Sequence, residues 1–220
     1  MNWISSIIQG ILLGGFYALV AAGLSFMFGV MRIVNLAHGA LVVVGAYLAF
    51  VLLDSFQLPL ALVLVIVVVV MAILGFALQR GILNRALQNG GLTPILVTFG
   101  LAVIVSNFLQ VQFSADSQSI ALDGLSSASI TVSEELSIGV LPLITFIVGV
   151  VVIAGLQIFL NTTSPGRAMR ATSDDQATAQ LMGIDNKKIY AIATAIALAT
   201  VGIAGVFLGL RTQFSPNYGD

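Results

Sequence analysis

The chain of 220 residues is 59% hydrophobic and only 8% charged, with a mean hydropathy of +1.09. About a quarter of the residues of a soluble domain are charged. The composition of this chain is therefore typical of an integral membrane protein and excludes an ordinary water-soluble domain. The net charge of −1 and the lack of a basic cluster argue against nucleic-acid binding, and the absence of cysteine excludes disulfides, thiol catalysis and cysteine-bound metal.

Six apolar segments are long enough to be read as membrane-spanning helices. About 20 apolar residues cross the hydrocarbon core as a helix. The segments lie at residues 4–30, 36–53, 58–79, 94–112, 138–160 and 189–210. No Lys or Arg precedes the first segment, and it is longer than the apolar region of a signal peptide, so we expect a span there rather than a cleaved leader. The sequence therefore predicts an all-α integral membrane protein with about six transmembrane helices.

The charged residues of the loops predict the orientation in the membrane. The loop after the third span carries Arg80 and Arg85 and no acid, whereas loop 114–137 carries four acids and no base. Loop 161–188 again carries two arginines and two lysines. Because Lys and Arg favour the cytoplasmic side, these loops alternate in, out and in, which puts the N-terminus outside. Arg211, at the outer end of the last span, is the exception.

The polar stretch MRIVNLAHGA (31–40) separates the first two spans and contains the chain's single histidine. Polar side chains are costly in lipid and usually face a bundle interior or water, so Asn35 and His38 are candidates for a substrate path. The alternative is an ordinary turn in the inner headgroup region. Asn107, in the fourth span, is a third path candidate, although a hydrogen bond across helices explains it equally well.

Loop 161–188 carries signals for the start of two short helices, expected at 165–172 and 174–182. Ser164 is suited to cap the first helix, with Pro165 at its first position. Ser173 and Gln176 fit a capping box at the start of the second.

The end of this loop carries a stop signal and a docking pattern. Gly183 is expected to end the second helix, with Ile184 closing an apolar contact behind it, and Asp185 or Asn186 would cap the next span. Ala177 and Leu181, four residues apart, share one helix face. Either the loop is an ordinary capped interfacial helix, or this face with its small side chains is a docking surface for a partner.

Two of these stretches resemble a known family. GRAMRATSDDQATAQLMGID (166–185) is similar to the coupling loop of the permease subunits of bacterial ABC importers in the branched-chain amino acid group. GLSFMFGVMRIVNLAHGALVVVGAYLA (23–49) resembles the N-terminal signature of the LivH-type permease. The resemblance implies a type II-like fold, one permease domain over 1–220 with a coupling loop at 161–188, and further C-terminal spans that this chain lacks.

The resemblance also implies which residues contact an ATPase. They are Gly166, Arg167, Arg170, Ala177, Ala179, Leu181, Met182, Gly183 and Ile184. Family members often have Glu-Ala-Ala where this chain has Ala177, Thr178 and Ala179, which leaves a salt bridge at that point without its acidic partner.

The implied function is transport without chemistry in this chain. A periplasmic or extracellular binding protein would deliver the amino acid, this permease and a second related or identical one would form the path, and two cytoplasmic ATPases would drive it. The chain itself would bind no metal or cofactor, and it has no GxxxxGK phosphate-binding loop. A bacterial inner-membrane location follows from the resemblance. Urea or short amides as substrates, an autonomous channel or secondary transporter, and a structural membrane anchor are the alternatives.

Overall fold

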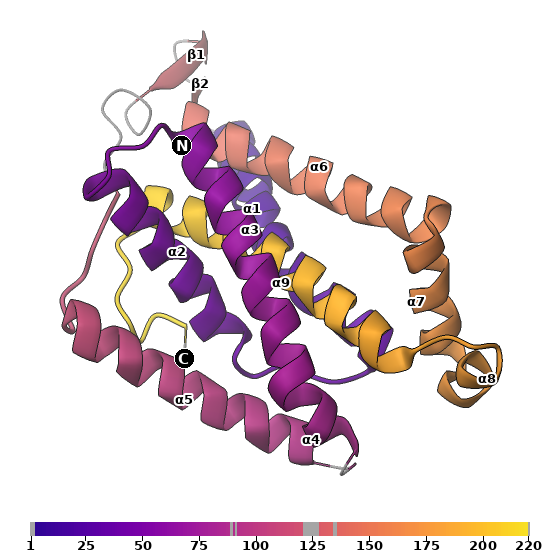
Figure 1. The fold of residues 1–220 in the computed structure, drawn as a ribbon. Coiled ribbons are helices and arrows are strands. Elements are labelled where there is room, and N and C mark those ends of the chain that lie inside the picture. Colours follow the sequence, from indigo (N-terminus) through magenta and orange to yellow (C-terminus); the bar gives the residue numbers. More distant parts are fainter. Residues whose placement is uncertain (1–2, 89, 91, 121–127, 134–135, 220) are drawn as a thin grey trace.

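The structure is a computed structural model that describes residues 3–88, 90, 92–120, 128–133 and 136–219 (Figure 1). Its long helices follow the apolar segments of the sequence. They are α1 (Trp3–Met31), α2 (His38–Asp54), α3 (Leu60–Leu78), α5 (Thr93–Phe113), α6 (Val140–Thr162) and α9 (Asn186–Arg211). Within the described residues, five helices are long and apolar enough to cross a membrane, and α2 is a shorter apolar helix. This confirms the prediction of an all-α membrane protein, because a helix satisfies its backbone groups internally in lipid.

Short elements extend or connect these helices at one end of the molecule. The third long helix continues through a π-helix, η1 (Gln79–Leu83), into α4 (Asn84–Gln88). Two further helices, α7 (Ser164–Asp174) and α8 (Gln176–Leu181), form the connection between α6 and α9. Two helices were predicted in that connection, and both are present.

Helix α9 is the centre of the bundle and contacts α1, α2 and α3. Of its most apolar 18-residue stretch, 72% is buried, against 11% for α6 and 22% for α5, which lie at the periphery (Figure 1). Small residues permit the central packing. The Cβ position of Gly45 on α2 lies 3.2 Å from the Cα of Gly202 on α9, and a Cβ on Gly205 would lie 2.4 Å from the carbonyl oxygen of Val42. Gly209, four residues further along α9, faces Ile120 and Phe214 instead.

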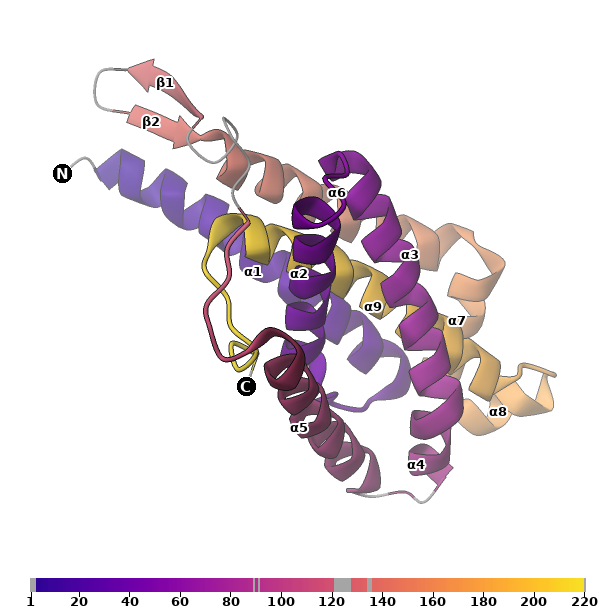
Figure 2. The same ribbon diagram turned by 60° about the vertical axis from the view of Figure 1, so that its left-hand side comes forward.

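Loop 114–137 contains a β-hairpin that the sequence analysis missed. Strands β1 (Ser129–Ser133) and β2 (Leu136–Gly139) pair antiparallel, with Ile130 opposite Ile138. The hairpin lies near the N-terminal end of α1, at the opposite end of the molecule from α7 and α8 (Figure 2). Three of the acids expected in this loop, Asp123, Glu134 and Glu135, lie outside the described residues.

The C-terminal segment returns against the bundle on the same side as loop 114–137. The backbones of Gln118 and Phe214 exchange two hydrogen bonds, of 2.8 and 2.9 Å. Phe214 packs edge-on against the buried ring of Tyr47, with 4.9 Å between ring centroids, and Phe113 of α5 stacks on Tyr47 at 4.4 Å. The guanidinium of Arg211, the exception to the charge pattern, lies 5.5 Å from the centre of the Phe16 ring.

Candidate functional site

Helix α7 begins with a cap from Thr163, not from Ser164 as the sequence analysis expected. The Thr163 backbone is extended, and its hydroxyl oxygen accepts the Gly166 N–H at 3.1 Å. Ser164 is already helical, which moves Pro165 to the second position of the first turn. Both hydroxyls are competent caps, so the extended backbone of Thr163 decides between them.

Helix α8 is capped by Asp175, and the predicted capping box of Ser173 and Gln176 is wrong. An Asp175 carboxylate oxygen accepts the Ala177 and Thr178 N–H groups at 2.9 and 3.1 Å. The Thr178 hydroxyl donates to the other carboxylate oxygen, and these hydrogen bonds hold the pKa of Asp175 below its ordinary value. The box fails because α7 runs on through Ser173, whose hydroxyl instead donates to the carbonyl oxygen of Gly29 on α1.

The expected stop at Gly183 is confirmed in detail. Gly183 has a φ of +84°, a conformation that glycine adopts at no steric cost. Its N–H donates to the Gln180 carbonyl at 2.9 Å, and the Ile184 N–H donates to the Ala179 carbonyl at 3.0 Å. This pair of bonds is the Schellman motif, and the half-buried Ile184 packs behind it against an apolar cluster.

A buried asparagine fixes α7 and α8 to the start of α9. The Asn186 side-chain oxygen accepts the Thr172 hydroxyl at 3.3 Å, and its nitrogen donates to the Gln176 carbonyl at 3.0 Å. The cap of α9 is Asp185, which accepts the Lys188 N–H at 3.2 Å. Of the two caps that the sequence left open, Asp185 is therefore the correct one, and Asn186 joins three helices instead.

The residues expected to contact an ATPase divide into an exposed set and a buried set. Leu181 is 87% exposed and Met182 is 79% exposed, side by side in a loop outside the predicted spans. Gly166 and Ala179 are buried, and Ile184 is half-buried, so these three hold the loop in shape. The exposed set also includes Arg167, Arg170, Ala177 and Gly183.

The two arginines of α7 are held close to the end of α6. Arg167 donates to the Thr162 carbonyl at 2.9 Å and to the Ser164 hydroxyl at 3.2 Å, and Arg170 donates to the Asn161 side-chain oxygen at 2.9 Å. Their guanidinium groups are therefore held at the junction of α6 and α7. Helix α7 itself lies at the end of the molecule opposite the hairpin (Figure 2).

Asn35 and His38 lie together inside the bundle, at 3% and 7% exposure. The Asn35 side-chain oxygen accepts the Ala37 N–H at 3.0 Å, which turns the chain into α2. His38 is the first residue of α2, and its Nε2 lies 2.9 Å from the Val20 carbonyl oxygen of α1. Val20 is eleven residues before the end of α1 at Met31, so His38 sits about 16 Å along α1 from that end.

The connection that leads to His38 re-enters the bundle and is held by α5. The Leu36 N–H donates to the Thr98 hydroxyl oxygen at 3.2 Å. Asn107 is on an exposed part of α5, where its side chain donates to the Val103 carbonyl of its own helix at 2.7 Å. The structure therefore brings Asn35 and His38 together, while Asn107 makes no hydrogen bond to either within the described part of the chain.

Sequence reasoning missed a buried polar network between η1, α4 and α9. Gln79 is fully buried, donates to the Asn84 side-chain oxygen at 3.0 Å and accepts the Thr194 hydroxyl at 2.8 Å. Asn84 donates in turn to the Lys187 carbonyl at 3.3 Å. The sequence signal for this network was the polar Gln79 at the end of an apolar run. The prediction used only the length of the run and treated Gln79 as the last residue of the span.

Comparison with known proteins supports the resemblance seen in the two motifs. The model of the family described as branched-chain amino acid transport system / permease component matches residues 6–220. The chain belongs to this family. The resemblance inferred from residues 23–49 and 166–185 is thereby confirmed, and the family is one of transport permeases rather than enzymes.

The chain aligns with individual relatives over nearly all of its own length and about 70% of theirs. The chain is 28% identical to the high-affinity branched-chain amino acid transport system permease protein BraD of Pseudomonas aeruginosa, over 96% of this chain and 72% of the relative. It is 26% identical to the corresponding LivH protein of Escherichia coli, over 95% and 71%. It is 27% identical to a probable branched-chain amino acid transport permease protein LivH of Methanocaldococcus jannaschii, over 97% and 69%. No solved structure matches the chain.

Proposed function

We propose that this permease is the membrane subunit of an ATP-driven importer for branched-chain or related amino acids. It would lie in the bacterial plasma membrane with its N-terminus outside, beside a second permease subunit. A binding protein would deliver substrate from outside, and two cytoplasmic ATPases would hydrolyse ATP, so that this chain needs no cofactor of its own. The family membership and the names of the relatives support this proposal.

The observation that carries the coupling role is the exposed apolar pair, Leu181 and Met182, on a firmly held loop. Large apolar side chains that remain in water on a rigid support are typical of a protein contact. Burying each of them stabilises a complex by about 1.5–3 kcal/mol. Because the loop ends in a Schellman motif and is joined to α9 through Asn186, little conformational entropy would be lost on docking.

The hydrogen bonds of the loop indicate how a push on α8 would reach the membrane. Asn186 links α8 to the start of α9, and Ser173 of α7 binds the Gly29 carbonyl near the end of α1. These two helices, α9 and α1, both contact α2 near the α1–α2 junction. Helix α9 packs against α2, and the carbonyl oxygen of Val20 on α1 contacts His38, the first residue of α2. Displacement of the loop would therefore change the positions of the buried Asn35 and His38.

Asn35 and His38 are the residues that we assign to the substrate path, with Asn107 as a further member. Two buried polar side chains about 16 Å along α1 are suited to face a path that opens within the bundle. Asn107, on the exposed part of α5, would face the path only where the second permease subunit covers that surface.

The test is a double substitution, Leu181→Gln with Met182→Gln. We expect the ATPases to bind the variant at least about a hundredfold more weakly, because two apolar contacts are lost. The variant should insert into the membrane and elute from a size-exclusion column as the wild-type protein does, since both side chains are exposed. Phe56→Gln is the matched control, because Phe56 is also exposed, at 65%, and lies in the connection between α2 and α3. Deletion of residues 177–183 should abolish association altogether.

Uptake by reconstituted vesicles tests the rest of the proposal. Vesicles with the permeases, the ATPases and the binding protein should accumulate leucine only with ATP, and should not accumulate urea. Uptake of leucine without ATPases would indicate an autonomous channel or secondary transporter. Co-purification of the ATPases with the Leu181→Gln, Met182→Gln variant as strongly as with the Phe56→Gln control would refute the docking surface.

A further inference from the structure

A basic pocket lies where the end of the third long helix meets the start of α9. It has a volume of about 610 Å³, and four cations line it, Arg80 and Arg85 from η1 and α4 and Lys187 and Lys188 from α9. The pocket includes Asp185, Lys187 and Lys188 from the end of loop 161–188, but none of the residues expected to contact an ATPase lines it, and it lies outside the α1–α2 junction. Nothing in the proposed transport cycle uses it.

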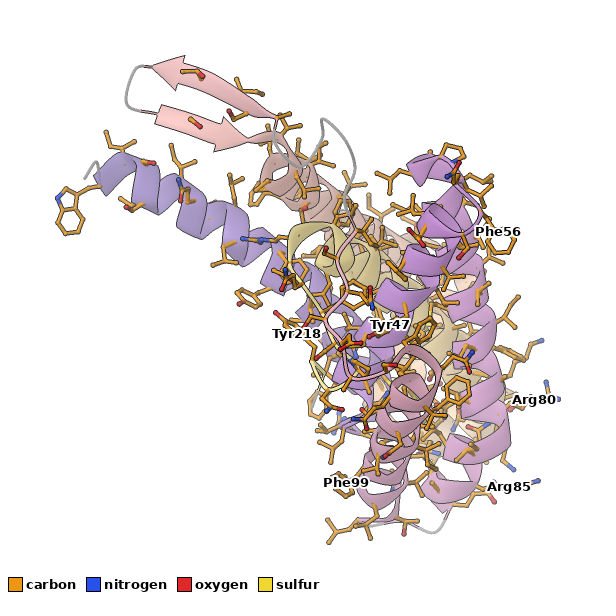
Figure 3. The ribbon with its side chains drawn as sticks, turned by 90° about the vertical axis from the view of Figure 1, so that its left-hand side faces the viewer. Tyr47, Phe56, Arg80, Arg85, Phe99 and Tyr218 are labelled. Carbon is orange, nitrogen blue, oxygen red and sulfur yellow. The ribbon has the colours of Figure 1, made fainter. Side chains whose placement is uncertain are left out.

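The π-helix brings the two arginines onto one side. In an α-helix, residues three and four apart are neighbours, so residues five apart point in different directions. In a π-helix the backbone bonds run from i to i+5, so residues five apart are stacked one turn above the other. Arg80 lies in η1 and Arg85 follows it in α4, and both point to the same side of the molecule (Figure 3). π-bulges of this kind frequently mark functional sites.

The walls of the pocket are held by buried hydrogen bonds. Gln79, directly before Arg80, binds Asn84 at 3.0 Å and Thr194 at 2.8 Å, and Asn84 binds the Lys187 carbonyl at 3.3 Å. These bonds join η1 and α4 to α9 directly behind the cations. The spacing between the arginine wall and the lysine wall is therefore fixed before any ligand arrives, which lowers the entropic cost of binding.

The cations of the pocket are not neutralised by acids of the described residues. None of the four forms an ion pair within the part of the chain that the structure describes. The single acid of the lining, Asp185, is engaged as the cap of α9 by the Lys188 N–H. The pocket thus has an excess of positive charge, and guanidinium groups bind phosphate oxygens in pairs where ammonium groups act as point charges.

An exposed apolar stripe leads along α3 directly to the pocket. Val65, Val69 and Ile73 are 56%, 51% and 64% exposed and recur at helical spacing. The stripe continues to Phe76, and the guanidinium carbon of Arg80 lies 6.0 Å from the centre of its ring. A ligand with a phosphate at Arg80 and a long apolar tail along α3 would satisfy both surfaces. A free phosphate or an acidic protein surface would leave the stripe unused.

We propose that this basic pocket binds the phosphate of an anionic phospholipid headgroup, with an acyl chain lying along α3. Basic pockets between membrane helices bind such headgroups on the cytoplasmic side. The site lies at the same end of the molecule as α7 and α8, where the charge pattern predicts the cytoplasm (Figure 1).

Titration of the purified full chain with lipid, followed by native mass spectrometry, tests the proposal. The probes are phosphatidylglycerol and phosphatidylcholine with identical acyl chains, and inorganic phosphate. The wild-type protein should retain phosphatidylglycerol in preference to phosphatidylcholine, and inorganic phosphate at millimolar concentration should not displace it. Each cation near an anionic headgroup contributes about fivefold in affinity, so Arg80→Gln with Arg85→Gln should weaken phosphatidylglycerol binding about thirtyfold.

The control removes an exposed cation that has no assigned role, Arg32→Gln, and should leave the affinity unchanged. Lys187→Gln with Lys188→Gln changes the opposite wall and should weaken binding by a similar factor, which tests the site even where the arginine variant does not fold. Equal retention of the two lipids, equal loss in the control, or displacement by inorganic phosphate would each overturn the proposal. So would an arginine variant that keeps phosphatidylglycerol but loses the ATPases.

Discussion

The crossing of α9 over α2 makes a sharp test of the packing, because backbone meets backbone there. A Cβ added at Gly205 would lie 2.4 Å from the Val42 carbonyl oxygen, 2.7 Å from the Ala46 nitrogen and 2.8 Å from the Gly45 carbonyl carbon. A side chain could rotate away from the new methyl group, but these three backbone atoms cannot. Gly205→Ala therefore forces the two helices apart.

The size of the effect follows from these distances. Non-bonded carbon atoms rest about 3.5–4.0 Å apart, so the helices must separate by about 1 Å. Inserting a methyl group into a well-packed core costs about 1–3 kcal/mol, and the rigid neighbours of Gly205 place this site at the upper end. Replacing Gly by Ala within a helix recovers about 1 kcal/mol. The net loss in free energy of unfolding is then about 2 kcal/mol, which lowers the melting temperature by about 4–8 °C.

Thermal unfolding in a mild detergent measures this shift, with Gly155→Ala as the control. Gly155 is also within a long helix, α6, but a Cβ there meets no atom within 4 Å. The control should melt at or above the wild-type temperature, because it gains helix propensity without a clash. A Gly205→Ala variant that melts with the control would refute the argument that this crossing depends on glycine.

Three further predictions use single side chains. His38→Ala removes the contact with the Val20 carbonyl and should slow uptake by vesicles without changing assembly, so normal uptake would remove His38 from the path. The pKa of Asp175 lies below its ordinary 3.8, so its carboxylate stabilises the start of α8 above that pH and loses this effect as the pH falls through the lowered pKa. As the pH falls through the lowered pKa, the first amides of α8 should lose protection relative to their intrinsic rate of hydrogen exchange, and unchanged protection would contradict the cap. Thr194→Val leaves the buried Gln79 oxygen without its donor and should cost about 1–3 kcal/mol in unfolding free energy, and an unchanged melting temperature would contradict this.

The spans were predictable because lipid allows few alternatives. A segment expected at 94–112 is the helix Thr93–Phe113, and one expected at 189–210 lies within Asn186–Arg211. In a bilayer the backbone must be hydrogen-bonded internally, so a long apolar run has little choice but to form a helix. Hydrophobicity alone therefore gives element type and approximate bounds.

The caps were harder to predict because neighbouring residues compete for the same role. Thr163 and Ser164 both carry a hydroxyl, and Ser173 and Asp175 both carry a suitable acceptor. Only the residue with an extended backbone immediately before the helix can cap it, and that depends on where the preceding helix ends. Gly183 had no competitor, since its φ of +84° disfavours any residue with a side chain, and its prediction is confirmed.

Depth in the bundle was beyond the reach of the sequence. Loop charges gave the side of the membrane for the stretch at 31–40, but they cannot tell a headgroup turn from a segment that re-enters the bundle. His38 lies about 16 Å along α1 because Asn35 turns the chain early and Thr98 of α5 holds the connection. The contacts of Leu36 with Thr98 and of His38 with Val20 join residues that are distant in the chain, and no local pattern reports them.

Helix α9 connects the three places to which functions are proposed above. It begins at Asp185 and Asn186, where the α7–α8 loop is fixed, and it continues through Thr194, which closes the network behind the basic pocket. Further along, Gly205 meets the backbone of α2, the helix that begins at His38. A rigid shift of α9 therefore changes all three places at once. The proposed lipid site and the proposed docking surface would in that case act on one helix, and a lipid that holds the end of α9 would oppose or favour the movement that the ATPases drive.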